Sequence, residues 1–213
     1  MRGKFITFEG GEGSGKSTQA RLLAEHLRAL GRTVIETREP GGSPFAERVR
    51  AFILDPTTPP HAPLSEALLF SAARADHVAG TIRPALAAGT WVVCDRFTDS
   101  TRVYQGAAGG LSSDVLDELE RIVVGPTRPD LTFLLDLDPA SGLGRAQRRA
   151  VATGAPTDAY EARDLAYHER LRRGFLDLAR GSPGRLVVVD AGAAVHVIAN
   201  QIRTHLAERL GAP

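Results

Sequence analysis

A glycine-rich stretch near the start of the chain has the residue types and spacing that bind phosphate. Residues 9–18 read Glu-Gly-Gly-Glu-Gly-Ser-Gly-Lys-Ser-Thr, which contains the pattern Gly-x-x-x-x-Gly-Lys-[Ser/Thr]. Glycines let consecutive backbone N–H groups turn toward one anion, the lysine reaches the β- and γ-phosphates, and the next hydroxyl offers a ligand to Mg²⁺. We therefore predict a nucleoside-triphosphate site formed by Gly10, Gly11, Glu12, Gly13, Ser14, Gly15, Lys16, Ser17 and Thr18.

The segments on either side of this stretch are those that a phosphate-binding loop needs. Residues 5–8 form a short apolar run typical of a buried strand, and residues 19–30 repeat leucine at helical spacing. The alternative is a glycine-rich turn that joins strand to helix and binds nothing. The strand–loop–helix context, with one of only two lysines of the chain in the required place, favours the nucleotide site.

Two further loops carry charged side chains directly after predicted strands. Arg-Glu-Pro-Gly-Gly at 38–42 follows a strand expected at 33–37, and Asp-Arg-Phe at 95–97 closes the apolar run 90–95. The carboxyl ends of parallel strands share one edge of the sheet, so these loops should meet the glycine-rich loop. An arginine there can grip an acceptor phosphate through two parallel hydrogen bonds, and Asp95 can hold Mg²⁺ directly or through water. Taken singly, each loop is also compatible with a local ion pair.

A predicted helix after Ser65 places Phe70 and Arg74 on one face, four residues apart. Such a pair suits a nucleobase. The base can stack on the aromatic ring, and the guanidinium can donate a hydrogen bond to a carbonyl oxygen of the base. Spacing alone favours a plainer interpretation, a core phenylalanine beside a solvated arginine.

Arginines are concentrated in and after residues 145–158, which we interpret as an inserted lid. Most side chains of such a charge run are solvated. One or two that close onto the phosphates would stabilise transition-state charge and exclude water from the reaction.

Composition limits the class of protein. The chain has 213 residues, 43% of them hydrophobic and 24% charged, with a net charge of +1, which is ordinary for one globular domain. So small a net charge gives no strong attraction to nucleic acid or to an anionic membrane. The longest apolar runs are too short to span a bilayer, and the single Cys94 cannot form an internal disulfide. We expect a cytoplasmic protein that binds neither nucleic acid nor membrane.

The alternation of predicted strands and helices indicates an α/β protein. We predict a single domain over residues 1–213 with a three-layer P-loop fold: about five parallel strands, helices on both faces, and the short lid. The expected strands are 4–9, 33–37, 90–95, 131–138 and 185–190, and the expected helices include 19–30, 43–54, one capped by Ser65, 114–124, 139–150, 158–180 and 193–210.

Several motifs together resemble thymidylate kinase of the bacterial type, within the P-loop nucleoside monophosphate kinases. They run from residue 5 to residue 136 as Phe-x-x-Phe-Glu-Gly-x-Glu-Gly-x-Gly-Lys-Ser-Thr, Thr-Arg-Glu-Pro-Gly-Gly, Glu-Ala-Leu-Leu-Phe-x-Ala-x-Arg, Asp-Arg-Phe-x-x-Ser-Thr-x-x-Tyr-Gln-Gly and Arg-Pro-Asp-Leu-Thr-x-x-Leu-Asp. The resemblance implies a homodimeric enzyme that phosphorylates dTMP to dTDP with ATP and Mg²⁺, in the synthesis of dTTP.

The resemblance also implies a role for individual residues. Lys16 and the loop amides would hold ATP, Ser17 and Asp95 would serve Mg²⁺, and Glu12 would lie near the 3′-hydroxyl of the acceptor. The phosphate of dTMP would be gripped by Arg38 and Arg96. The rest of the acceptor site would consist of Phe70 stacked on thymine, Arg74 on its 4-carbonyl, Ser100, Thr101 and Gln105 along the pocket, and Tyr104 against the 2′ position.

Two positions depart from the pattern of that family. Gly13 stands where some branches carry a basic residue, which places the catalytic arginine in the lid. The lid motif Asp-Arg-x-Glu corresponds here to Asp-Ala-Tyr-Glu at 158–161, so we predict that Arg148 or Arg149 takes this role.

Two alternative functions remain compatible with the phosphate loop. One is a kinase for another nucleotide or a small alcohol, which Phe70, Arg74 and Tyr104 argue against. The other is a nucleotide-binding switch without turnover. A switch with guanine specificity would need an Asn-Lys-x-Asp motif, which a chain whose lysines are Lys4 and Lys16 lacks.

Overall fold

A parallel sheet forms the centre of the molecule. The structure, a computed structural model, describes residues 2–59, 61–154 and 159–211. Five strands lie within these ranges, in the order β2-β3-β1-β4-β5, and every pair of neighbours is parallel. Their bounds are β1 (Phe5–Glu9), β2 (Val34–Arg38), β3 (Trp91–Asp95), β4 (Leu131–Asp136) and β5 (Leu186–Asp190).

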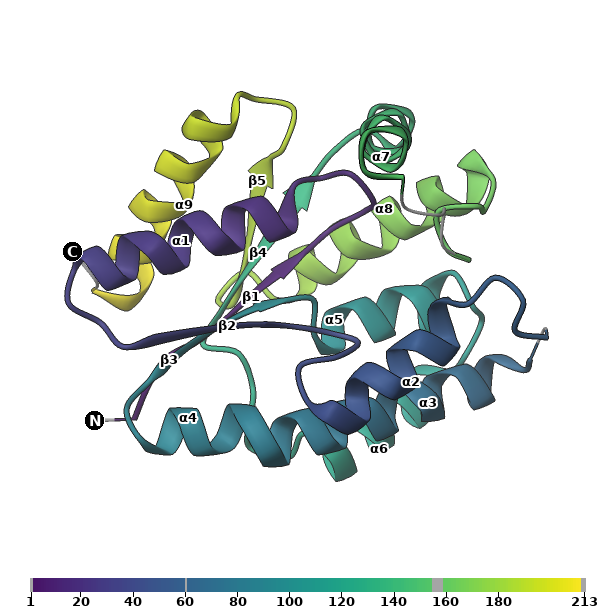
Figure 1. The fold of residues 1–213 in the computed structure, drawn as a ribbon, viewed down its shortest axis with the longest axis horizontal. Helices are drawn as coiled ribbons and strands as arrows, with labels where there is room; N and C mark the ends of the chain where they lie inside the picture. The colour runs from purple at the N-terminus through teal and green to yellow at the C-terminus, as the bar shows by residue number, and fades with distance from the viewer. Residues whose placement is uncertain (1, 60, 155–158, 212–213) are drawn as a thin grey trace.

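Helices cover both faces of the sheet, as predicted (Figure 1). Side chains alternate between the faces of a strand, so Ile6 and Phe8 pack toward α1 (Lys16–Ala29) and α9 (Val195–Leu210). The opposite face is covered by α3 (Pro63–His77), the π-helical segment η1 (Val78–Ile82), α4 (Arg83–Ala87) and α8 (Leu165–Gly181). The remaining helical segments are α2 (Pro44–Leu54), α5 (Thr98–Thr101), the π-helical η2 (Arg102–Ala107), α6 (Ser113–Val123) and α7 (Pro139–Thr153).

Burial on both faces explains why the inner strands are almost continuously apolar. All of β1 and all but the last residue of β4 are buried. The edge strand β2 buries only Val34, and its other residues are partly or fully exposed.

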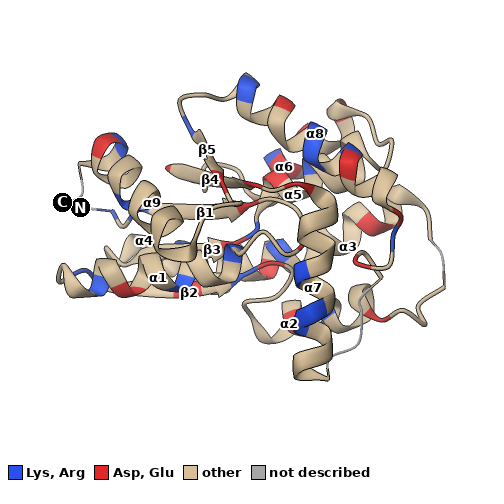
Figure 2. Ribbon diagram, turned by 90° about the horizontal axis from the view of Figure 1, so that it is seen from above, with Lys and Arg blue, Asp and Glu red and all other residues tan. Residues whose placement is uncertain are grey.

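The carboxyl ends of three strands bring the predicted loops together. In the register of the sheet, Asp95 of β3 lies opposite Arg38 of β2 on one side and Phe8 of β1 on the other. The glycine-rich loop continues from β1 at this edge, where acidic and basic positions of the chain are interspersed beside α2 and α7 (Figure 2). Such an edge, where the strand order departs in both directions from β1, is where ligands bind in open α/β sheets.

Several predicted boundaries were wrong. The helix expected at 158–180 begins only at Leu165, where the Asp164 carboxylate accepts a hydrogen bond from the Tyr167 amide. Ser65 is not a cap, because Pro63 already occupies the first turn of α3 with its backbone torsion preset for a helix.

Two other differences concern residues near the loops. Sequence reasoning assigned no element to 98–107, which the structure folds into α5 and η2. The described part of the predicted lid, 145–154, is the second half of α7 and its C-cap, and 155–158 lie outside the described residues. Among the described residues, no helix combines the length and the apolar character that crossing a bilayer requires.

Candidate functional site

A pocket of about 440 Å³ opens at the carboxyl edge of the sheet. Every residue predicted for the acceptor lines it, as do Lys16, Ser17, Thr18, Gly13 and Gly15 of the phosphate loop. Of the other predicted residues, Gly10, Gly11, Ser14 and Arg148 are not on its wall, whereas Arg149 is. The acceptor residues on the wall are Glu12, Arg38, Phe70, Arg74, Asp95, Arg96, Ser100, Thr101, Tyr104 and Gln105.

The glycine-rich loop delivers the first turn of α1 to the pocket. Gly15 occupies the N-cap position with a φ of 91°, a conformation that favours glycine, and Lys16 follows as the first helical residue. The Lys16 Nζ atom donates a hydrogen bond to the Gly11 carbonyl oxygen at 2.7 Å. Burial and the nearby Arg96 guanidinium lower the pKa of Lys16 to about 8. Burial thus disfavours the charged form of Lys16, and a negatively charged partner such as a phosphate would stabilise it.

Ser17 and Asp95 have the chemistry of a magnesium site. The Ser17 hydroxyl donates to Asp95 Oδ2, and the buried Asp95 Oδ1 has no hydrogen-bond partner among the described residues. A buried carboxylate oxygen without a partner is costly, and a hard cation that takes oxygen ligands would satisfy it. The two side chains therefore fit the ion predicted from the sequence.

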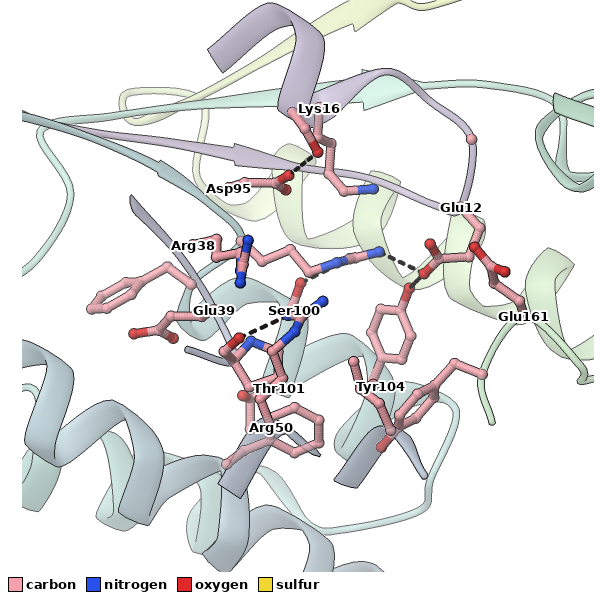
Figure 3. A pocket seen from close by; sticks show the side chains of 18 of the residues that line it. Glu12, Lys16, Arg38, Glu39, Arg50, Asp95, Ser100, Thr101, Tyr104 and Glu161 are labelled. Atoms are coloured by element: carbon pink, nitrogen blue, oxygen red, sulfur yellow. Dashed lines mark hydrogen bonds and ion pairs between the residues drawn. The ribbon is translucent and has the colours of Figure 1, made fainter. Parts of the chain in front are cut away.

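Arg96 and Tyr104 together hold Glu12 in place. Arg96 Nη2 donates to Glu12 Oε1 at 2.6 Å. The Tyr104 hydroxyl donates to the same oxygen at 2.9 Å, and Figure 3 shows Tyr104 pointing toward Glu12. Burial alone would raise the pKa of Glu12, but the charges of Arg96 and Lys16 lower it to about 2. Glu12 is therefore a fixed carboxylate at neutral pH.

Hydrogen bonds to Glu9 stabilise the turn that carries Arg96. Arg96 has a φ of 69°, which is rare for a residue other than glycine, so neighbouring contacts must stabilise it. The fully buried Glu9 accepts hydrogen bonds from the Phe97 amide at 2.8 Å and from the Ser100 hydroxyl at 2.6 Å. The Arg96 Nη1 atom donates to Ser100 Oγ at 3.1 Å and to the Gly10 carbonyl oxygen at 3.0 Å.

The buried Glu9 should make stability depend on pH. Burial and the nearby Asp99 raise the pKa of Glu9 from 4.5 to about 8. Between these values the folded state binds a proton that the unfolded state does not, so the free energy of unfolding should fall as pH rises through this window. In urea titrations at several pH values, Glu9→Gln should remove this slope, which is at most about 1.4 kcal/mol per pH unit. Glu25→Gln on the exposed side of α1 is the control, and a Glu9→Gln curve parallel to wild type would contradict the assignment.

Phe70 and Arg74 of α3 also line the pocket. The buried Arg74 donates through Nε to Glu39 Oε2 at 2.6 Å and through Nη2 to the Phe97 carbonyl at 3.2 Å. Among the described residues these are the hydrogen bonds of its guanidinium, so Nη1 is left for a ligand. Half-buried Phe70 keeps part of its ring accessible to the pocket. The plainer interpretation of a solvated arginine is therefore wrong.

Sequence reasoning missed several residues of the wall. Glu39 holds Arg74 from a loop far away in the chain, and Arg50 donates to the Pro40 carbonyl at 2.7 Å. Glu39 lies inside a recognised motif, so its carboxylate could have been noticed. Arg50 carried no such signal. The other missed wall residues are Pro40, Leu54, Phe97, Tyr160 and Glu161.

The lid side of the pocket is closed by an ion pair. Arg149 near the end of α7 donates to Glu161 Oε1 at 2.6 Å, and both side chains line the pocket. Tyr160 donates to Glu66 Oε1 at 2.6 Å, and Gln105 donates to the other oxygen of the same carboxylate at 3.0 Å. Of the two arginines proposed from the sequence, the geometry favours Arg149.

Comparison with known proteins assigns the family. Residues 8–202 match the family model for thymidylate kinase. The thymidylate kinase of Nitrobacter hamburgensis (strain DSM 10229) is 50% identical over 210 residues, which cover 99% of this chain and 90% of that protein. The thymidylate kinase of Caulobacter vibrioides (strain ATCC 19089) is 49% identical over 210 residues, which cover 99% of this chain and 99% of that protein. The crystal structure of thymidylate kinase from Ehrlichia chaffeensis superposes with a TM-score of 0.77 at 34% identity, covering 97% of this chain and 99% of that one. The family model, the relatives and the shared fold agree, and the chain belongs to the thymidylate kinase family.

Proposed function

We propose that this pocket carries out the phosphorylation of dTMP to dTDP that the family implies, with ATP bound at the phosphate loop and dTMP in the pocket wall opposite. The observation that carries the proposal is the arrangement of one pocket. Its wall combines residues of the phosphate loop, Phe70 and Arg74 of α3, and the two strand-end arginines Arg38 and Arg96.

The reaction needs charge neutralisation and alignment more than a protein base. A phosphate oxygen of dTMP attacks the γ-phosphorus of ATP, the bond from that phosphorus to the β,γ-bridging oxygen breaks, and ADP leaves. The attacking oxygen is already ionised at neutral pH. Lys16 and the loop amides hold the donor phosphates, while Arg38 and Arg96 orient the acceptor phosphate.

The sugar and base of dTMP would be recognised by the remaining wall. Phe70 stacks on thymine, and the available Arg74 nitrogen donates to the 4-carbonyl, which disfavours the amino group of cytosine at that position. Glu12, fixed by Arg96 and Tyr104, accepts from the 3′-hydroxyl, and Tyr104 fills the space that a 2′-hydroxyl would need. Ser100, Thr101 and Gln105 complete the wall.

Mg²⁺ would be held by Asp95 and Ser17, whose unsatisfied oxygen and hydroxyl support this assignment. When bound, the ion neutralises charge on the donor phosphates.

A panel of acceptors tests the function. The purified protein is mixed with ATP, Mg²⁺ and one acceptor at a time, and ADP release is followed in a coupled assay. We expect dTMP to be preferred over dCMP, dAMP and shikimate by at least about 100-fold in kcat/KM. Equal rates would refute the acceptor assignment, and no ADP with any acceptor would favour a binding protein without turnover.

We also propose that the enzyme works as a cytoplasmic homodimer on free nucleotides rather than on nucleic acid. Its single free cysteine, Cys94, and its small net charge support this location and these substrates. The neighbouring helices α2, α3 and α6 expose a set of large apolar side chains that a second copy could cover, namely Phe45, Phe52, Leu64, Leu68, Val115 and Ile122. Light scattering should give twice the 22.7 kDa of one chain, and a monomer at assay concentration would refute the dimer.

A further inference from the structure

Helix α7 rests directly on the backbone of the phosphate loop. A Cβ atom at Gly142 of α7 would lie 2.3 Å from the Glu12 carbonyl oxygen. A Cβ atom at Gly13 would lie 2.0 Å from the Gly142 carbonyl oxygen. Side chains cannot be accommodated at such distances, and the opposing atoms are backbone that cannot rotate away. The two glycines therefore form a direct contact between loop and helix. Figure 1 shows α7 beside the loop that joins β1 to α1.

The start of α7 is fixed on both sides of this contact. The Asp138 carboxylate caps the helix by accepting from the Ser141 amide at 2.9 Å. One turn beyond Gly142, Ala146 is buried and Arg145 donates to the Ala191 carbonyl at 3.0 Å. The helix therefore begins at a position that the loop and the core determine.

The same face of α7 carries Arg149 into the pocket. Gly142 and Arg149 are two helical turns apart, a spacing that returns to one side of the helix. Arg149 lines the pocket beside Glu161, while Arg148, one residue earlier, does not line it. The contact at Gly142 fixes the position of α7 relative to the loop. It thereby also fixes where Arg149, on the same face of the helix, enters the pocket.

We propose that Gly13 and Gly142 are positioning residues for the phosphoryl transfer: their contact couples the phosphate loop to α7 and sets Arg149 against the donor phosphates. This inference rests on the proposed function, because it assigns Arg149 to that reaction. It also accounts for the absence of a basic side chain at position 13 of the loop, beside Lys16. Any side chain at Gly13 would displace α7, so a second cation, in addition to Lys16, must reach the phosphates from outside the loop.

Alanine at two glycines of the same helix tests the contact. Gly142→Ala places a methyl group against the loop, whereas Gly144→Ala meets only Arg148 Nη1 at 3.6 Å, an ordinary contact. Both changes improve helix propensity by about 1 kcal/mol, so propensity cannot separate them. We expect Gly142→Ala to lower kcat by about 10-fold or more and Gly144→Ala to stay within about 2-fold of wild type. The proposed thymine contacts Phe70 and Arg74 lie on α3, away from Gly142, so the preference for dTMP over dCMP should change by less than about 3-fold in both variants. Equal kcat values would overturn the inference.

A double variant shows whether the contact acts through Arg149. Arg149→Ala alone should lower kcat by about 100-fold, and adding Gly142→Ala should lower it by no more than about 2-fold further. Independent effects that multiply would overturn the coupling, as would an Arg149→Ala enzyme of unchanged kcat. A wild-type protein inactive on dTMP would instead refute the proposed function.

A second measurement does not depend on the folding of Gly142→Ala. In the Arg149→Ala protein, where direct contact between that side chain and the donor is removed, a non-hydrolysable ATP analogue should slow hydrogen exchange of backbone amides in 140–146. Unchanged exchange there, with exchange slowed in the loop itself, would overturn the coupling.

Discussion

Replacing Lys16 with alanine is expected to lower kcat for dTMP phosphorylation by about 10³-fold. Lys16 is the cation that the phosphate loop itself contributes, and its ammonium is buried beside the Gly11 carbonyl. The unliganded protein should lose no stability, because burial and Arg96 already disfavour the charged form of Lys16 and lower its pKa. The loss should therefore appear in kcat at an unchanged melting temperature.

The other lysine of the chain is a matched control. Lys4 lies on the surface, where its Nζ atom is 3.4 Å from Asp130, and a pair of this kind contributes little. Lys4→Ala should keep kcat within about 2-fold of wild type. A Lys16→Ala enzyme with wild-type turnover would refute the role of the loop.

Replacing Arg96 with alanine is expected to lower kcat/KM for dTMP by about 10²- to 10³-fold. The change removes one of the two guanidinium groups proposed for the acceptor phosphate. It also leaves Glu12 buried without the partner that holds its pKa low. Steady-state kinetics at varied dTMP concentration measures the loss.

Two further variants separate these effects. Arg96→Lys keeps a positive charge near Glu12 but loses the two parallel hydrogen bonds, so it should recover only part of the activity. Arg21→Ala, which breaks an exposed ion pair with Glu25 on α1, should leave kcat/KM for dTMP unchanged. An Arg96→Lys enzyme as active as wild type would contradict the bidentate grip.

Local sequence pattern was sufficient for the sheet and for the loops at its carboxyl edge, whereas the other acceptor residues were implied by the family resemblance. The inner strands are buried on both faces, so their apolar runs were unambiguous. The phosphate loop and the segments at Arg38 and Arg96 lie at or directly after strand ends, and the register of Arg38 beside Asp95 brings them together. The alternation of strands and helices was enough to predict this convergence, because parallel strands end at a common edge.

The missed features depend on contacts between distant segments. No local pattern pairs Glu39 with Arg74 or Glu66 with Tyr160, since each pair joins separate loops and helices. The contact of Gly13 with Gly142 was invisible for the same reason, although Gly13 was noticed as a departure from the family pattern. The helix predicted at 158–180 starts later than expected, at Leu165, where the Asp164 side chain caps it.

The most direct test of the central claim is a crystal structure of the enzyme with dTMP and a non-hydrolysable ATP analogue. We predict the γ-phosphate on the amides of the phosphate loop and the dTMP phosphate between Arg38 and Arg96, in line with it, with thymine against the Phe70 ring. A dTMP molecule whose phosphate points away from Arg96, or whose base lies away from Phe70, would contradict the account.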